Sequence, residues 1–176
     1  AFVPAWQANS QEVQLLREST FGLSHFGLAY GVGYSGHFYH GNLHIDVSAD
    51  GSQTLQNLDG EAYLSNRLAA EYVDGVLEFR YRSAANNKGR YNRFYVGAIA
   101  GYRVDSYAYL QTEDYRVKFY NIGGFSTLRY GAYLKAGRGP FNLYYYYGLN
   151  PIVESGVLVL ELGAATSQNI GLSITL

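Results

Sequence analysis

The stretch PFNLYYYYGLN, residues 140–150, decides the fold. Its odd-numbered residues form a continuous apolar row, whereas the even-numbered residues carry amides, phenols or no side chain. A period of two residues predicts a β-strand. Four consecutive tyrosines are too bulky and too polar for both faces of a small dry core. We therefore expect one face on lipid and the other on a hydrogen-bonding interior, as in a transmembrane β-barrel.

Five further segments show the same alternation between polar or glycine-rich connections. Each apolar row spans about 9 to 11 residues, which is the length that a tilted strand needs to cross hydrocarbon. The rows lie at 26–34, 73–81, 94–104, 128–136 and 170–176. Together with 140–150 they predict six strands, and eight is the smallest usual number for a closed barrel.

Residues 1–25 must then supply two strands. We expect a short edge strand in AFVPAWQ, residues 1–7, because Pro4 is confined to an edge or a strand start. Its expected partner is EVQLLRE, residues 12–18, across the turn-like Ala8, Asn9 and Ser10.

The connections between the predicted strands alternate in length. Those at 46–67, about 110–120 and 150–168 are long, whereas those at 83–92 and 137–140 are shorter. We interpret 46–67 as a polar loop, and 157–162 as a strand extension within the last long connection. Short turns at one end and long loops at the other are typical of outer-membrane barrels.

Composition agrees with a β-rich membrane protein and excludes several classes. The 176 residues carry a net charge of -1, which offers no basic surface for nucleic acid. There are 21 glycines, 19 tyrosines and no cysteine, so disulfides and thiolate chemistry are excluded. The sequence contains no run of 18 apolar residues, so it predicts no membrane-spanning helix. The sequence opens at Ala1 without a charged, apolar leader, so a signal peptide has been removed or none existed, and we expect one that has been cleaved.

Charged residues fall on the inward face of the predicted strands. In a narrow barrel they must be paired or hydrated, since an isolated buried ion costs several kcal/mol. We therefore expect a structural network of ion pairs that plugs the barrel, with a conducting pore as the alternative. The predicted network consists of Asp74, Glu78, Arg80, Arg82, Arg93, Arg103, Asp105, Arg129 and Lys135.

Three patterns resemble catalytic or ligand sites but are explained by strand structure. GVGYSG, residues 31–36, matches a dinucleotide fingerprint, but strand-like residues follow it where the motif requires a helix. Ser24 and His25 are adjacent, so they point to opposite faces of a strand. His37, His40 and His44 are spaced too widely along a strand to bind one metal. We expect no catalytic site, cofactor or metal.

Several segments resemble a known family. RYGAYLKAGRGPFNLYYYYGLNPIVESG (129–156) and NIGLSITL (169–176) resemble the last three strands of the small outer-membrane β-barrel proteins of Bacteroidota, the PorT-like group. LAAEYVDGVLEFRYRS (68–83) and YVGAIAGYRV (95–104) are similar to the two preceding strands. The resemblance covers the C-terminal two thirds. It implies an eight-stranded barrel in a Gram-negative outer membrane and, for some relatives, a subunit of a larger envelope machine.

The sequence thus predicts a single all-β domain over residues 1–176, a transmembrane antiparallel up-and-down β-barrel of eight strands. The expected function is that of a non-catalytic accessory subunit of an outer-membrane assembly. Its expected partners are outer-membrane lipid or lipopolysaccharide and other outer-membrane or periplasmic proteins. The alternatives are a standalone barrel that binds an external partner through its loops, and a soluble lipocalin-like carrier. The soluble carrier fits less well, because charges share the inward face and the outward rows are nearly free of charge.

Overall fold

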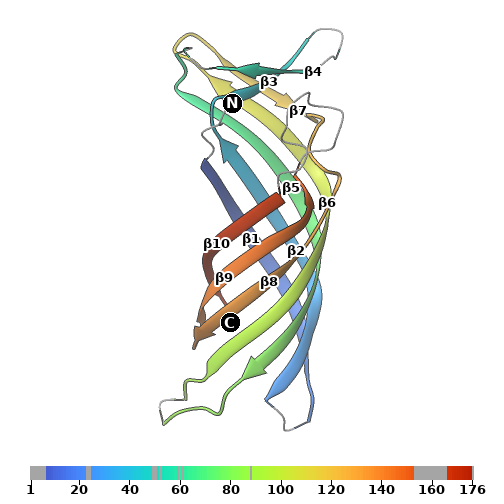
Figure 1. Ribbon diagram of the computed structural model, residues 1–176, viewed down its shortest axis with the longest axis vertical. Helices are drawn as coiled ribbons and strands as arrows, with labels where there is room; N and C mark the ends of the chain where they lie inside the picture. Colours follow the sequence, from blue (N-terminus) through green and yellow to red (C-terminus); the bar gives the residue numbers. More distant parts are fainter. Residues whose placement is uncertain are drawn as a thin grey trace.

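The computed structural model describes residues 7–22, 25–48, 53–58, 62–87, 89–152 and 166–175, together with Gly51 and Gly60. Within these ranges the protein is all-β (Figure 1). No helix among them is long and apolar enough to span a membrane. The strands are β1 (Gln7–Thr20), β2 (Phe26–His40), β3 (Leu43–Val47), β4 (Gln53–Asn57), β5 (Ser65–Arg82), β6 (Asn92–Gln111), β7 (Arg116–Tyr120), β8 (Leu128–Arg138), β9 (Phe141–Pro151) and β10 (Thr166–Ile174).

One antiparallel sheet makes up most of the molecule, in the order β1-β2-β5-β6-β8-β9-β10. The neighbours in this path follow one another along the sheet in chain order, as in an up-and-down topology. β7 pairs with residues 107–111 of β6, whereas β8 pairs with residues 92–102 of the same strand. We call the end that carries β3, β4 and β7 the loop end, and the opposite end the turn end (Figure 1).

The alternation predicted from the sequence is confirmed along the sheet. In β8, outward-facing Leu134 is 42% exposed, whereas inward-facing Tyr133 is 1% exposed. The same contrast holds in β5, β6 and β9. The turn at Gly139 and Pro140 is confirmed as well, and Gly139 has a positive φ of 62°.

The prediction for the N-terminal region is wrong. β1 is one strand of 14 residues that runs through the expected turn at 8–10. Its outward residues, Val13 and Leu15, alternate with an inward row of charged and amide side chains. The inward row of this strand is polar because its side chains fill the hydrogen-bonded interior. The sequence of β1 therefore lacks the long apolar content by which the other strands were predicted. Residues 1–6, which hold most of the predicted edge strand, lie outside the described part of the chain.

Residues 46–67 do not form the simple polar loop that the sequence predicts. They hold most of a β-hairpin instead. β3 and β4 pair with each other, and β5 begins at Ser65. The hairpin packs through Ile45 onto a small apolar core at the loop end. Likewise, the predicted connection at about 110–120 contains β7. The expected extension at 157–162 lies outside the described residues.

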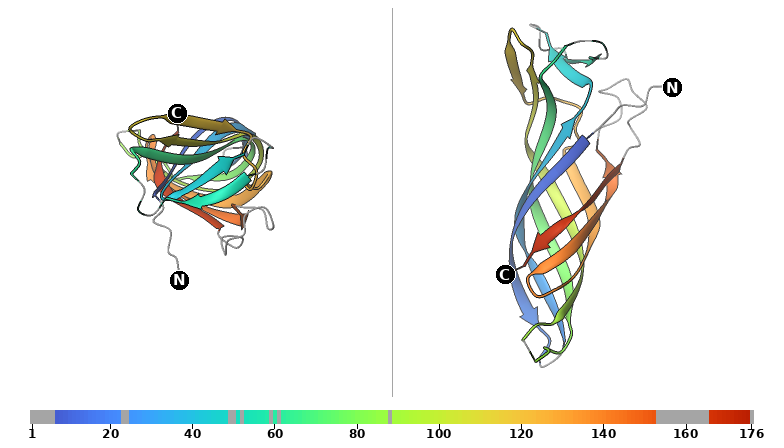
Figure 2. Two further views of the ribbon diagram at one scale, coloured as in Figure 1. Left: turned by 90° about the horizontal axis from the view of Figure 1, so that it is seen from above. Right: turned by 90° about the vertical axis from the view of Figure 1, so that its left-hand side faces the viewer.

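The expected closed barrel of eight strands is confirmed only as an antiparallel up-and-down sheet. Among the described residues, no ladder joins β1 to β10. Both edge strands run from the loop end to the turn end, since seven strands alternate in direction along the path. The sheet nevertheless curls until its edges approach each other, which Figure 2 shows from above and from the side. We call the line between the two edges the β1/β10 seam.

Candidate functional site

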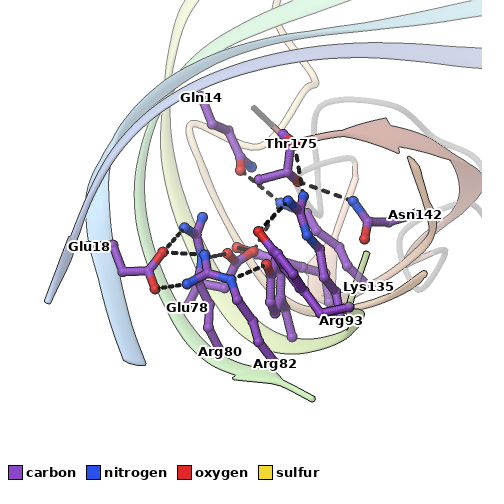
Figure 3. A network of polar contacts seen from close by, with 12 residues as sticks. Gln14, Glu18, Glu78, Arg80, Arg82, Arg93, Lys135, Asn142 and Thr175 are labelled. Carbon is purple, nitrogen blue, oxygen red and sulfur yellow. Dashed lines mark hydrogen bonds and ion pairs between the residues drawn. The ribbon is translucent and has the colours of Figure 1, made fainter. Parts of the chain in front are cut away.

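The charged interior is the most developed constellation in the molecule. Near the turn end, Glu18 of β1 pairs with Arg80 and Arg82 of β5. Arg80 also pairs with Glu78, and Lys135 Nζ of β8 lies 2.9 Å from Glu78 Oε2. We call these five residues the turn-end cluster; Figure 3 shows them pointing toward one another from opposite sides of the curled sheet.

Phenols complete the coordination of this cluster. Tyr133 donates a hydrogen bond of 2.7 Å to Glu78 Oε2, and Arg82 Nε donates one of 3.1 Å to the hydroxyl of Tyr95. Lys135 Nζ also donates to Gln14 Oε1 at 3.2 Å. Glu78 is fully buried, so three partners at its carboxylate replace the water it has lost.

A second group lies nearer the loop end. Arg129 of β8 pairs with Glu12 of β1 at 2.9 Å and with Asp74 of β5 at 3.3 Å. Tyr144 of β9 donates a hydrogen bond of 3.1 Å to Glu12. The guanidinium also contacts Nε2 of His37, which must accept because arginine only donates. We call Glu12, Asp74 and Arg129 the middle cluster.

Glycines on β6 make room for both clusters. A Cβ on Gly97 would meet the ring of Tyr133 at 2.2 Å, so the phenol reaches Glu78 only because Gly97 has no side chain. A Cβ on Gly101 would meet Asp74 Oδ1 at 2.2 Å and Arg129 Cγ at 3.2 Å. The small inward residues of β6 are therefore part of the network, although they carry no charge.

Charge in the two clusters is balanced. Four carboxylates (Glu12, Glu18, Asp74 and Glu78) face four cations (Arg80, Arg82, Arg129 and Lys135), joined by six ion pairs. Within the described part of the chain, removal of Arg129 leaves Glu12 and Asp74 without an ion-pair partner, and removal of Glu78 leaves Lys135 without one. Breaking a buried ion pair in this way destabilises a protein by about 3–5 kcal/mol. Chemically, this arrangement fills and cross-links the interior.

The structure brings six of the nine predicted network residues into the clusters and separates three. Arg93 donates to the backbone oxygen of Thr175 and to Tyr91 at the turn end. Arg103 donates to the backbone oxygen of Ile122, and Asp105 accepts from the backbone N–H of Ser106. Among the described residues no ion pair joins these three residues to the two clusters, although Arg93 contacts Tyr91, over whose ring the Arg82 guanidinium also lies.

Sequence reasoning missed the acids of β1. Glu12 and Glu18 supply half of the carboxylates, and the strand that carries them was predicted in two pieces. Their spacing, together with Gln14 and Leu16, is an even-numbered inward row. The alternation of this row with outward-facing Val13 and Leu15 is the sequence signal that would have placed Glu12 and Glu18 on the inward face.

The other sequence patterns take structural positions. Residues 31–36 lie in the middle of β2. Ser24 lies outside the described residues, whereas His25 lies at the turn end beside Tyr81, with ring centroids 6.3 Å apart. Nδ1 of His44 lies 3.3 Å from Asn66 Oδ1, beyond the barrel. In the described ranges, no three His, Cys, Asp or Glu side chains are placed to hold a metal ion.

The loop end is an ordered extension of the sheet. Its apolar core is built from β3, β5, β6 and the residues between β7 and β8, and includes Ile45, Leu68, Ala108, Ile122 and Phe125. Four large side chains, Tyr63, Leu64, Tyr115 and Tyr120, remain between 37% and 63% exposed there. We call these four residues the loop-end patch.

No family model, curated protein or solved structure matches the chain. The resemblance to the PorT-like group therefore stays a prediction that rests on the segments quoted above. Any functional conclusion must come from the geometry of the sheet, its interior and its loop end.

Proposed function

We propose that this chain is an integral outer-membrane β-barrel that acts as a non-catalytic accessory subunit of a larger outer-membrane assembly. One observation carries the membrane location. The outward residues of β2, β5, β6, β8, β9 and β10 form an exposed apolar band, to which β1 adds Val13 and Leu15 beside the polar Gln11 and Arg17, while the charged groups of the two clusters lie inside. A soluble barrel of this size needs the reverse arrangement, since exposed apolar patches of a few hundred Å² are already large for a soluble monomer.

The band also has the dimensions of a bilayer. Along β6, Phe94, Val96, Tyr102 and Val104 are exposed at alternate positions, and Ala98 and Ala100 lie between them. A tilted strand needs about 9–11 residues to cross hydrocarbon, and this row is of that length. Tyrosines flank such bands at the two interfaces in outer-membrane barrels.

The filled interior favours an accessory role over transport. The cavity among His37, Tyr72, Arg129 and Tyr146 has a volume of only about 20 Å³. A site of this volume holds about one water molecule, so this section of the interior has no room for a larger solute. The ion pairs across it would have to break before anything could pass.

The loop-end patch offers a surface for a protein partner. Its aromatic and leucine side chains are exposed at the end where the hairpin and β7 extend the sheet, and aromatic residues are enriched at protein interfaces. The backbone N–H of Leu64 donates to the oxygen of Gln111 at 2.8 Å, which ties the start of β5 to the β6–β7 turn.

The test is purification of the native protein from membranes in mild detergent. We expect a fixed set of outer-membrane or periplasmic proteins to co-purify. Leu64→Asp combined with Tyr115→Asp should reduce their recovery at least tenfold, because two charged groups would enter a desolvated contact. The control is Asn86→Asp with Asn87→Asp, at the turn between β5 and β6. A native protein that runs as a lone monomer at every stage contradicts the subunit role.

The second candidate is a standalone barrel that binds an external ligand through its loops. The ordered loop-end patch is compatible with this function too. The two candidates differ in the same purification, because a standalone binder remains monomeric in the membrane while the loop-end variants lose the binding of an added external protein.

A further inference from the structure

Aromatic rings and cations alternate across the outward face of the sheet at the loop end, beyond the apolar band. The guanidinium of Arg67 on β5 lies over the rings of Phe38 and Tyr107, at 5.7 and 5.6 Å from their centroids. Nζ of Lys118 on β7 lies 4.0 Å from the centroid of Tyr107 and 4.5 Å from that of Tyr120. We call these five residues the cation ladder.

The outward direction of the cation ladder follows from strand parity. Leu68 of β5 and Ala108 of β6 belong to the apolar core at the loop end, so their chain neighbours Arg67 and Tyr107 face the opposite way. Tyr107 is only 7% exposed although it faces outward, because the two cations lie over its ring. Lys118 itself is exposed on β7.

A β-bulge in β6 produces this parity. Glu71 of β5 pairs with Asp105 of β6. The next pair along β5 joins Tyr72 to Arg103, so Val104 is an extra residue in β6. The outward residues of β6 therefore have even numbers before the bulge and odd numbers beyond it. Bulges of this kind re-aim side chains and are features of the design rather than defects.

The height of the cation ladder above the band can be estimated from the strand register. Val73 and Tyr102 form the last exposed outward pair before the bulge. Ala69 and Tyr107 pair about four residues further toward the loop end, which is about 13 Å along the strand. A strand tilt of about 40° reduces this to about 10 Å along the membrane normal. The polar layer on each side of an ordinary bilayer is only about 5–8 Å thick, so the ladder suits a taller headgroup.

The two cations lean toward the band and have no counterion in the described part of the chain. Both align with Tyr109 in the strand register, yet their charged groups lie over Tyr107, one outward position nearer the band. Neither Arg67 nor Lys118 makes an ion pair with a described residue. The buried Nε of Arg67 also has no hydrogen-bond partner there.

Two carboxylates lie between the cation ladder and the band, and other donors hold them. Glu71 accepts a hydrogen bond from the hydroxyl of Tyr34, and Asp105 accepts one of 2.7 Å from a backbone N–H. The hydroxyl of Tyr120 and, more weakly, the nearby Asp105 raise the pKa of Lys118, so its ammonium stays charged. The acids repel an anion at the edge of the hydrocarbon, which again favours a phosphate carried higher.

We propose that the cation ladder binds a phosphate of lipid A, the phosphorylated disaccharide of outer-leaflet lipopolysaccharide, through Arg67 and Lys118. This inference rests on the proposed outer-membrane location, in which the end with the longer connections faces outward. Arginine binds phosphate through two N–H groups while it stacks on a ring, and lysine adds a point charge. The rings hold both cations before binding, which reduces the entropy lost. The exposed ring of Tyr120 offers an apolar face to a sugar.

The test compares lipid binding by the purified protein in micelles of a mild detergent, with bound lipid counted by native mass spectrometry. The probes are lipid A with both phosphates, lipid A without phosphates, and phosphatidylglycerol. We expect the first to bind at least about tenfold more tightly than either of the others. Arg67→Gln combined with Lys118→Gln should lower the affinity for lipid A at least about tenfold, because two charge-assisted contacts are lost.

Two control variants separate the site from charge and folding. Arg90→Gln with Arg138→Gln removes two exposed cations at the turn end and should bind lipid A like the wild type. Arg67→Lys with Lys118→Arg keeps both charges and should retain most of the binding. Reversible urea unfolding in lipid vesicles checks that each variant is folded.

Equal binding of lipid A and its dephosphorylated form by the wild type would overturn the proposal, and so would equal binding of phosphatidylglycerol. An equal loss in the turn-end control would reduce the effect to net charge and overturn it too. Loss of protein partners with unchanged lipid A binding would assign the cation ladder to a protein interface instead. Extraction of the wild type from membranes by alkaline carbonate contradicts the membrane location. A protein that resists extraction but does not discriminate among the three lipids contradicts only this site.

Discussion

Tyr133 of β8 donates a 2.7 Å hydrogen bond to Glu78 of β5 across the intervening β6, and it does so over the bare backbone of Gly97. Two strands separated by a third are thereby joined through the interior. The fit depends on three positions at once: a small residue in the middle, a long phenol on one side and a carboxylate on the other. This dependence makes the interior sensitive to changes that carry no charge.

Gly97→Ala is therefore expected to destabilise the curled sheet. Its Cβ would lie 2.2 Å from the Tyr133 ring, so the ring must move and its bond to Glu78 lengthens or breaks. Overpacking of this kind costs about 1–3 kcal/mol, measured as the free energy of unfolding in urea with the protein in lipid vesicles. Gly171→Ala is the control, because its Cβ meets nothing within 4 Å. Equal stability of the two variants would contradict the packing described here.

Glu78 and Lys135 should show strong energetic coupling. Glu78→Gln alone leaves Lys135 and Arg80 with one carboxylate fewer, and Lys135→Met alone leaves Glu78 short of a cation. The double variant removes both members, so its loss of stability should fall below the sum of the single losses by about 1–3 kcal/mol. The same cycle on Glu113 and Arg116, which are exposed at the loop end, should be additive. If the stability losses at Glu78 and Lys135 are additive as well, the two residues are not energetically coupled, and their ion pair does not stabilise the interior.

His44 makes the docking of the β3–β4 hairpin dependent on pH. Burial lowers the pKa of His44, and this effect outweighs the hydrogen bond that His44 Nδ1 donates to Asn66 Oδ1 and the nearby Asp46, both of which raise it. The folded hairpin thus favours neutral imidazole. Its contribution to stability is complete above the unfolded pKa of about 6.5 and declines as pH falls below that value.

Hydrogen exchange of the β3–β4 amides is the measurement for His44. Protection, corrected for the intrinsic pH dependence of exchange, should fall between pH 7.5 and pH 5. His44→Gln, which cannot titrate, should remove this fall while keeping a hydrogen-bond donor for Asn66. Constant protection of the wild-type β3–β4 amides between pH 7.5 and pH 5 would show that neutral His44 does not stabilise the docked hairpin.

Much of the sheet could be predicted from alternation alone. The outward rows of β5, β6, β8 and β9 were placed because apolar and polar residues alternate strictly there. Interior charges on the same strands, such as Asp74 and Arg129, followed from the same parity. The pairing of Glu78 with Lys135 could not, because it depends on how strands β5 and β8 face each other across Gly97.

The misplaced regions share a physical cause. β1 carries charged and amide side chains on its inward face, so its composition resembles that of a loop although its parity is that of a strand. The β3–β4 hairpin is polar because it lies at the loop end, outside the main sheet, and only a few of its side chains, such as Ile45, pack on the core. Closure of a barrel depends on the number and direction of its strands. A single strand or turn that is wrongly predicted from the sequence changes both.

Ala132→Arg tests most directly whether the outward apolar band faces lipid. Ala132 lies midway along the outward row of β8, between Tyr130 and Leu134, so in the proposed membrane location an arginine there would lie near the middle of the bilayer. We predict that folding into lipid vesicles loses about 2–4 kcal/mol, as measured by reversible urea unfolding. The matched control is Ala85→Arg in the turn between β5 and β6, which should change the stability by less than about 0.5 kcal/mol. An Ala132→Arg protein that folds into vesicles as stably as the wild type would show that this face does not lie in lipid.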